Sequence, residues 1–407
     1  MVLNAEQKNK FDVAVVGASV VGLTTALGLS SLGYRVALLG SLAALFSADS
    51  EQPFDSRVFA LNHSSQRLLE RLNLWAHLNH QRIQPVAFMQ IWGDQPTVCQ
   101  GELQFGANDS GVSQLNWIVE QQTLLEVLST AVQYQSGITW LRQPVQSMKF
   151  TPQGWFLTTS GATLHAQLVV AADGAQSFTR QQAGLDFEVH SFGAKAVVAT
   201  WNVQHSHRAT ARQWFNGQNI LAMLPLPGSY VSMVWSMPTH QANTFCDAGL
   251  SQQVQMLQQV SCSALAHHYG KLHLCGKILS YPLSHGVAPI WYENQVALIG
   301  DAAHVVHPLA GLGLNLGFED VSELIQQIEA ACAYGQQKQD ILINLMFWKN
   351  WQRKRKAACA SINWLTQGLH YVFRVNALGV PFIRNAGMRV VNAMPSFKRW
   401  LCSQAMR

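Results

Sequence analysis

Three separated motifs carry residues whose types and spacing could do chemistry. The first is Gly17-x-Ser19-x-x-Gly22, which follows a short apolar run and opens a helical pattern. Gly17 permits a tight turn, Gly22 allows the helix to pack closely on the strand, and the helix start presents unpaired N–H groups to a pyrophosphate. Taken alone the pattern is weak evidence, because a glycine-bearing turn between strand and helix also occurs in unrelated α/β proteins.

The other two motifs add carboxylates to glycines. VVAADGAQSFTR, residues 169–180, contains Asp173 and Gly174, and residues 298–319 contain GDAAH with Asp301. A carboxylate that follows a buried strand can accept hydrogen bonds from ribose or ribitol hydroxyls, and glycines let the main chain approach a flat ring. The third motif continues through Pro308, Gly311, Leu312, Gly313, Leu314 and Asn315. Together and in this order, the three motifs are highly specific.

Histidines and cysteines do not form a metal-binding pattern. His304 and His307 lie inside the third motif without other donors at metal-ligand spacing, so we expect packing or polar lining ahead of proton transfer. His267 and His268 are expected on a solvated helical face. The seven cysteines are scattered without a CxxC pair, which argues against a disulfide scaffold or structural zinc and for a reducing compartment. No metal site is predicted.

The elements around the motifs predict an interrupted α/β fold. Residues 11–40 form a strand–helix–strand opening, residues 118–131 a helix, and residues 346 onward a helical tail. Residues 186–285 are rich in β-branched and aromatic residues. Trp201, Trp214 and Trp235 in this stretch are expected to build a sheet core rather than a substrate clamp. The chain therefore alternates between a nucleotide-type domain and β-rich inserts.

The chain resembles the class A flavoprotein monooxygenases, which share the para-hydroxybenzoate hydroxylase fold, along nearly all its length. Within them it looks most like the aromatic-ring hydroxylases of ubiquinone biosynthesis. The resemblance is carried by SRVFALNHSSQRLLERLNLW at 56–75, by Asp173-Gly174, and by the run GDAAH…PLAG…GLNLG…D at 300–320. It implies an α/β fold: a Rossmann-like FAD-binding domain (1–81, 114–184 and 286–345), an inserted β-sheet substrate domain (82–113 and 185–285) and C-terminal helices (346–407).

The resemblance also implies roles for single residues. Gly17 and Gly22 would face the FAD pyrophosphate, and Asp301 would bind the ribitol chain. Pro308 would lie at the flavin face where oxygen is activated. Arg57 would lie beside the flavin, and residues 313–315 would contact the isoalloxazine edge, with Gly311 in the same loop. The family also links one motif to both FAD and NAD(P)H, and its members here are Asp173, Gly174, Ser177 and Arg180. The implied reaction uses NAD(P)H, FAD and O2 to hydroxylate a phenol ring.

Four positions depart from the family pattern, and all four would touch FAD. Ser19 replaces a glycine, Gly40 an acidic residue that would bind ribose, Gln122 an arginine, and Leu312 a glutamine. Each lost hydrogen bond to a charged group costs about 1.5–3 kcal/mol, so several losses would make FAD weakly held. An active hydroxylase and a flavin-poor scaffolding subunit of a ubiquinone-biosynthesis complex both stay open. A plain NAD(P)-dependent dehydrogenase gives no reason for the Asp301 motif.

Composition and charge limit the partners. Hydrophobic residues make up 48% and charged residues 12%, and the net charge is +5. The sequence contains no Lys/Arg block beside stacking aromatics, which argues against a nucleic-acid-binding protein. No signal peptide is visible, and residues 219–237 are broken by Pro225, Pro227 and Gly228, so we expect a hairpin rather than a transmembrane helix and a cytoplasmic protein. The basic, tryptophan-bearing tail is consistent with two interpretations. In the first, it forms a helix that closes over the FAD domain. In the second, it attaches the protein to an anionic inner membrane, or to a partner that holds a prenylated substrate.

Overall fold

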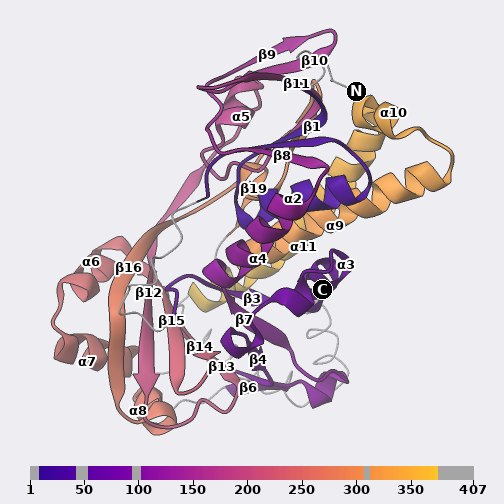
Figure 1. The fold of residues 1–407 in the computed structure, drawn as a ribbon. Helices are drawn as coiled ribbons and strands as arrows, with labels where there is room; N and C mark the ends of the chain where they lie inside the picture. Colours follow the sequence, from indigo (N-terminus) through magenta and orange to yellow (C-terminus); the bar gives the residue numbers. More distant parts are fainter. Residues whose placement is uncertain (1–8, 43–53, 94–101, 307–311, 375–407) are drawn as a thin grey trace.

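The structure, a computed structural model, describes residues 9–42, 54–93, 102–306 and 312–374. Its β structure forms two eight-stranded sheets and one of three strands. The first sheet and the long helices lie towards the upper right of Figure 1, and the second sheet lies at the lower left. Strands β12 (His190–Val203) and β16 (Leu272–Val287) run between these two regions. The arrangement agrees with the predicted mixed α/β class.

The first sheet is built on short, uniformly apolar strands, which is typical of parallel strands covered on both faces. Its order is β17-β18-β11-β1-β2-β8, with an antiparallel ribbon of β10 and β9 on β11. The pairs from β18 to β8 are parallel. The strands are β1 (Lys10–Val16), β2 (Val36–Leu39), β8 (Ile138–Leu141), β9 (Ser147–Thr151), β10 (Gly154–Thr158), β11 (Thr163–Ala171), β17 (Tyr292–Glu293) and β18 (Val296–Leu298). The Asp173 and Asp301 motifs follow β11 and β18, so both lie at the carboxyl ends of neighbouring strands.

Helices α2 (Val20–Ser31), α4 (Gln121–Tyr134) and α9 (Leu312–Ala333) share the core of this sheet, and α2 contacts both others. The predicted helix at 118–131 is wrong at its start, because Asn116–Glu120 form strand β7. The run NWIV is apolar and partly β-branched, and it pairs with β3 (Val58–Leu61) and β4 (Gln84–Val86) in the third sheet. The shorter elements here are α3 (His63–Arg71), α5 (Phe178–Gln182), η1 (Trp75–His77), η2 (His80–Arg82) and η4 (Gly300–Ala302).

The second sheet has the order β19-β16-β12-β15-β14-β13-β5-β6. Strands from residues 82–113 and from residues 185–285 thus join one sheet. The additional strands are β5 (Phe88–Trp92), β6 (Glu102–Gly106), β13 (Thr210–Asn216), β14 (Asn219–Leu226), β15 (Tyr230–Pro238) and β19 (His304–Val305), with η3 (Asn108–Ser110) after β6. The expected hairpin around Pro225 is confirmed, because β14 pairs antiparallel with β15.

One face of the second sheet is covered by helices, which the β-rich reading of 186–285 did not include. They are α6 (Thr239–Asp247), α7 (Leu250–Val260) and α8 (Ala264–Tyr269). Trp201, Trp214 and Trp235 are buried in the core that this face shares with the helices. The three tryptophans therefore build the sheet core, as expected.

The C-terminal part packs on the first sheet through α10 (Lys338–Ile343) and α11 (Leu345–Arg374). Trp348 and Trp351 are fully buried, and Trp348 stacks on Tyr292 with ring centroids 4.9 Å apart. Among the described helices, none has the length and apolarity needed to cross a bilayer.

Candidate functional site

A cavity of about 850 Å³ lies between the first and second sheets, and all three sequence motifs contribute to its lining. Gly17 and Ser19 come from the first motif, Asp173 from the second, and Asp301 and Gly313 from the third. The opposite wall comes from the second sheet. Residues more than 290 positions apart in the sequence are therefore brought to one cavity.

The turn after β1 needs glycine at two positions. Gly17 has φ of 111°, and a Cβ there would lie 2.4 Å from the carbonyl oxygen of Ala172. A Cβ on Gly22 would lie 1.8 Å from the carbonyl oxygen of Gly17. The helix start is thus held tightly against the ends of β1 and β11, which leaves its first N–H groups directed at the cavity.

Ser19 is the N-cap of α2. Its hydroxyl accepts a hydrogen bond from the Gly22 N–H at 3.3 Å and donates to the Ala172 carbonyl at 3.3 Å. The side chain is exposed towards the cavity that it lines. Serine therefore stabilises the helix start, but it occupies one of the N–H groups that a phosphate could otherwise use.

Gly40 also lines the cavity, and its backbone requires glycine. Its φ is 125°, and a Cβ would lie 3.3 Å from the Ala18 nitrogen. Its carbonyl accepts a hydrogen bond from the Trp140 indole at 2.9 Å. The position where the family pattern has an acidic residue therefore has a backbone conformation in this chain that residues with a side chain rarely adopt.

The Asp173 motif is tied internally. Asp173 accepts hydrogen bonds from the Thr179 N–H at 2.9 Å and from the Ser177 hydroxyl. Arg180 is buried and donates to the carbonyls of Ala175 and Ala302, both at 2.8 Å. Burial lowers the pKa of Arg180, an effect that the nearby Asp173 opposes. Arg180 therefore links the second motif to the backbone of the third.

Asp301 is exposed only towards the cavity, since protein atoms surround it on its other sides. Burial raises the pKa of its carboxyl, and the charges of His304 and Arg57 act in the opposite direction. Among the described residues, no hydrogen bond to this carboxylate is formed. Asp301 is thus an acceptor that a ligand hydroxyl can satisfy.

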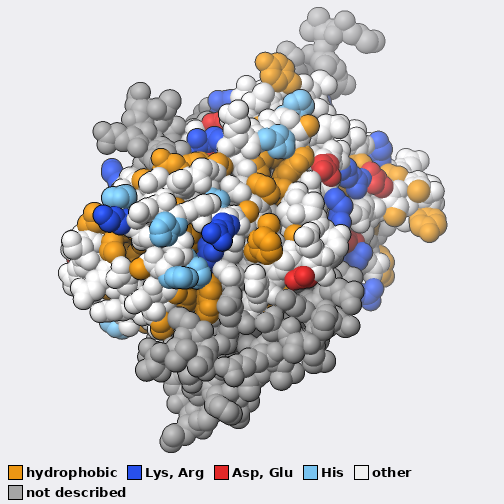
Figure 2. Space-filling model, turned by 90° about the horizontal axis from the view of Figure 1, so that it is seen from below, with side chains coloured by type: hydrophobic (Ala, Val, Ile, Leu, Met, Phe, Trp, Pro, Cys, Tyr) orange, Lys and Arg blue, Asp and Glu red, His pale blue; other side chains and the backbone are white. Residues whose placement is uncertain are grey.

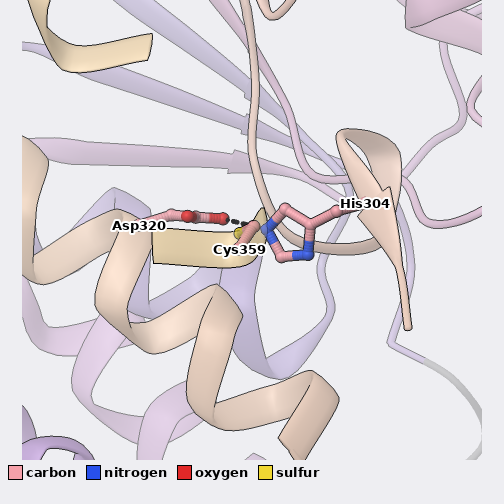
Figure 3. Close-up of side chains that lie close together, drawn as sticks. All are labelled: His304, Asp320 and Cys359. Atoms are coloured by element: carbon pink, nitrogen blue, oxygen red, sulfur yellow. Dashed lines mark hydrogen bonds and ion pairs between the residues drawn. The ribbon is translucent and has the colours of Figure 1, made fainter. Parts of the chain in front are cut away.

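A buried ionic network lies behind Asp301. The Asp320 carboxylate accepts hydrogen bonds from His304 Nε2 at 2.7 Å, the Gly300 N–H at 2.9 Å and Arg355 Nε at 2.7 Å. Figure 3 shows the His304–Asp320 contact, with Cys359 of α11 beside it. Because Gly300 precedes Asp301, the network holds the backbone that carries the cavity carboxylate.

His304, Asp320 and Cys359 offer ligand atoms within 4.8 Å of one another. Three features disfavour a metal ion there. Arg355 already balances the Asp320 charge, and Glu319 lies 3.2 Å from the same guanidinium. Burial raises the pKa of the Cys359 thiol far above its usual range, which disfavours the thiolate in the metal-free protein. The cluster is an ion-pair network that joins α11 to α9.

The structure places several predicted cofactor residues away from the cavity. Asn315 is buried, accepts hydrogen bonds from the Ser65 hydroxyl and the Asn62 N–H, and donates to the Ala60 carbonyl. The Gln122 side chain donates to Glu126 at 2.8 Å. The neighbouring Gln121 lines the cavity instead, together with the predicted residues Arg57, Gly174, Gly313 and Leu314.

Some predicted residues lie outside the described ranges. These are His307, Pro308 and Gly311; Leu312 begins α9, but its side chain is not described. His267 and His268 lie on α8, far from the first sheet (Figure 1). His267 is exposed, and burial, with Arg212 and His267 adding to it, lowers the pKa of His268 to about 4. In Figure 2, which views the molecule from below, histidine and cationic side chains gather at the left, whereas acidic and cationic side chains lie side by side at the right.

The sequence analysis did not predict the ion pair between Asp320 and Arg355. Asp320 ends the third motif, and Arg355 lies in the basic tail, so an acid and a base were visible 35 positions apart. No spacing rule joins such positions. Only the packing of α11 on α9 brings them together.

Comparison with known proteins places this chain in a family. The profile described as "FAD binding domain" matches residues 10–344. The chain belongs to the FAD-binding domain family. The sequence-based resemblance and fold class are confirmed, and the cavity where the three motifs meet is the candidate FAD site.

Relatives extend over the whole chain. The "3-demethoxyubiquinol 3-hydroxylase" of Escherichia coli is 28% identical, covering 97% of this chain and 98% of its own. The mitochondrial "Ubiquinone biosynthesis monooxygenase COQ6" of Danio rerio is 27% identical, covering 99% and 91%. The crystal structure of p-nitrophenol 4-monooxygenase PnpA from Pseudomonas putida DLL-E4 matches with a TM-score of 0.76 at 17% identity, covering 97% of each chain, which supports the shared fold.

The residues at the FAD site fit the cofactor. The glycine turn lets the start of α2 pack tightly against the ends of β1 and β11, and the start of α2 supplies main-chain donors for a pyrophosphate. Asp301 supplies an acceptor without a described partner for ribitol hydroxyls, and Arg57 adds a cation on the same cavity. These residues would hold FAD, which supplies the redox chemistry when bound.

Proposed function

We propose that this protein is a monooxygenase that uses FAD, NAD(P)H and O2 to hydroxylate the aromatic ring of a polyprenylated phenol in ubiquinone biosynthesis. In the overall reaction one oxygen atom enters the ring and the other leaves as water, while NAD(P)H supplies two electrons. The observation that carries the proposal is one cavity whose first wall is the FAD site and whose second wall is a largely apolar sheet face. The names of the relatives supply the substrate class.

The chain's own contribution is binding and shielding. The second sheet supplies small apolar side chains that suit a planar ring: Ala196, Val198, Ala222 and Val234. An apolar wall excludes water from the ring and from the cofactor that the first wall would hold, which would limit side reactions. Among the described lining residues we assign no general base.

A scaffolding role is the alternative, in which the protein supports a ubiquinone-biosynthesis complex without turnover. Two features favour catalysis. Asp301 opens onto the cavity and forms no hydrogen bond to a described residue, so its carboxylate is available to the hydroxyls of a ligand. The relatives above are named as hydroxylase and monooxygenase.

The deciding experiment combines binding with product analysis. Purified protein is titrated with FAD and its absorbance spectrum recorded, then supplied with a short-chain 2-prenylphenol, ¹⁸O2, and NADH or NADPH in parallel. We expect a bound flavin spectrum, substrate-dependent NAD(P)H oxidation and one ¹⁸O atom in the product. Protein that stays colourless with excess FAD and consumes no NAD(P)H would support the scaffolding role.

We also infer a cytoplasmic location with peripheral contact to the inner membrane, since a polyprenylated substrate resides in lipid. Three of the described cations of α11 are engaged within the protein, whereas Lys349 and Arg353 are exposed. Lys354 pairs with Glu323 at 2.7 Å, Lys356 donates to the Pro289 carbonyl at 2.6 Å, and Arg355 is buried. Membrane contact through the tail would therefore draw on Lys349 and Arg353 of α11 and on residues 375–407, which lie outside the described ranges.

A further inference from the structure

The two faces of the second sheet differ in side-chain size. Strand residues that point to α6–α8 are large and form a filled core: Trp201, Trp214, Met223, Met233 and Trp235. Their neighbours in sequence point the other way, because side chains alternate along a strand. On that other face, the following side chains that line the cavity are small: Ala196, Val198, Ala211, Ala222 and Val234. These small side chains leave space over this part of the face.

Gln213 is a polar exception on the small-residue face. Its neighbours Arg212 and Trp214 face the helices, where Arg212 donates to the Tyr269 hydroxyl at 3.2 Å. Alternation therefore directs Gln213 to the cavity, whose lining includes it. The residue is only 7% exposed, and its side-chain amide forms no hydrogen bond to any described residue.

Asn116 is a second amide of this kind. It begins β7, lines the same cavity, and has a buried Oδ1 atom without a hydrogen-bond partner. Ile118, two positions later and on the same face of β7, packs in one cluster with Ala211, two positions before Gln213. The third and second sheets thus each present one free amide to a wall that is otherwise mostly apolar.

The buried Oδ1 atom of Asn116 has lost its hydrogen bonds to water without a replacement among the described residues, which is costly. The Gln213 amide lines the cavity and is available to a ligand there. A ligand hydroxyl that donates to the Asn116 oxygen removes the cost, whereas a hydrocarbon of the same shape leaves it in place. A site built to hydrogen-bond a hydroxyl therefore discriminates strongly against the analogue that lacks it.

We propose that Gln213, assisted by Asn116, is the specificity-determining residue that recognises the oxygen substituents of the aromatic ring. This inference rests on the proposed function, since it assigns the ring to the apolar face of the same cavity. An amide both donates and accepts, so Gln213 can bind a phenol hydroxyl in either role. The apolar wall accommodates the ring and the start of the prenyl chain.

The test measures binding in the FAD-loaded protein without NAD(P)H, using the flavin absorbance change as the signal. The probes are 2-(3-methylbut-2-enyl)phenol and the corresponding benzene without the hydroxyl. We expect the wild type to bind the phenol at least tenfold more tightly. Gln213→Met, which keeps length and volume, should weaken phenol binding about tenfold and leave the hydrocarbon unchanged or tighter.

Gln218→Met is the matched control, because Gln218 is exposed in the turn after β13. It should bind both probes as the wild type does. Asn116→Leu should give a smaller loss for the phenol and a larger one for 2-methoxy-6-prenylphenol, which carries a second oxygen.

The outcomes separate this inference from the proposed function. Equal affinity of the wild type for both probes overturns the role of Gln213 without any variant, and therefore also if Gln213→Met fails to fold. Hydroxylation of the phenol by the wild type together with unchanged binding in Gln213→Met overturns the inference but leaves the proposed function standing. Failure of the wild type to bind either probe removes both.

Discussion

At the residue scale, Ser19 and Gly40, which depart from the family pattern, each support the local structure of this chain. Ser19 caps α2, and Gly40 adopts a backbone conformation suited to glycine. Asp301, which follows the pattern, lies where burial raises its pKa. Stability and cofactor binding therefore respond differently to substitution at each of the three positions.

Ser19→Gly should tighten FAD binding by about tenfold while changing stability by only a few tenths of a kcal/mol, because glycine is itself an acceptable N-cap. The substitution removes the Cβ and releases the Gly22 N–H for a phosphate. Flavin fluorescence titration gives the dissociation constant, and urea unfolding gives the stability. Ser19→Ala keeps the Cβ and loses the cap, so it should cost about 1 kcal/mol of stability without the gain. Weaker FAD binding in Ser19→Gly would show that the hydroxyl contacts the cofactor.

Gly40→Glu should not simply restore a ribose contact. A φ of 125° is strained for glutamate, so the free energy of unfolding should fall by about 1–3 kcal/mol. Ser41→Glu, at the next position along the cavity lining, is the comparison, since Ser41 has no positive φ. Chemical denaturation of both apo proteins measures the difference. Equal stability of the two variants would contradict the backbone argument.

Asp301→Asn should raise the melting temperature of the apo protein at pH 7 and weaken FAD binding. A raised pKa means that the folded state disfavours the carboxylate, so wild-type stability falls as the pH rises through the folded pKa. The advantage of Asp301→Asn should therefore shrink as the pH is lowered towards the ordinary carboxyl range. Thermal melts from pH 4 to 7 test this, with the exposed Asp186→Asn as control. An advantage that grows at low pH would give the opposite sign.

At the scale of elements, the FAD site depends on a helix far from it in sequence. Helix α11 places Arg355 against Asp320 of α9, and Asp320 in turn holds Gly300 and His304 around the Asp301 turn. The carboxylate stays ionised: His304 and Arg355 lower the pKa of Asp320 against the opposing effect of burial. The charges are thus balanced only while α11 is in place.

Arg355→Met should cost about 3–5 kcal/mol of stability, since it leaves the buried Asp320 carboxylate uncompensated. The double variant Arg355→Met/Asp320→Asn removes both charges and should lose less than the single variant. Arg353→Met is the control, because Arg353 is exposed and contacts only Asn350 among the described side chains. Urea unfolding measures all three. A double variant as unstable as the sum of its parts would argue against the coupling.

At the scale of the whole molecule, the two sheets and the C-terminal helix form one unit around the cavity. Strands β12 and β16 extend from the second sheet towards the first sheet (Figure 1). The aromatic residues of α11 are part of the first core rather than a surface patch. A test of membrane attachment must therefore keep α11.

Truncation after residue 374 should leave a folded protein that binds FAD, whereas truncation after residue 345 should expose the core and cause aggregation. The shorter form lacks Trp348 and Trp351, and loss of one buried tryptophan side chain typically costs about 3–5 kcal/mol. Circular dichroism and size-exclusion chromatography compare the two forms. Anionic vesicle binding is then measured on the 1–374 form and the full chain. Equal vesicle binding would remove residues 375–407 from the membrane proposal.

The sequence by itself determined the order of the elements, the βαβ opening and the three motifs that identify an FAD-binding fold. Those features follow from local rules: apolar runs make buried strands, and glycines mark turns with special backbone angles. Local reading misplaced the start of α4 and missed α6 and α7, although it expected a helical segment at His267 and His268, which lie in α8. Apolar β-branched residues before α4 pair in a sheet only through partners distant in the chain, which a local window does not contain.

Only the tertiary structure decided how the site is assembled. Packing brings Arg355 into contact with Asp320 and buries the Asn315 side chain. It places Gln121, and not Gln122, on the cavity lining. It also leaves the Gln213 amide and the Asn116 Oδ1 atom without a hydrogen-bond partner among the described residues. It also showed that Ser19 and Gly40 suit the local backbone of the FAD site. These outcomes depend on contacts between residues far apart in sequence, and such contacts exist only once the two sheets and α11 have packed around the cavity.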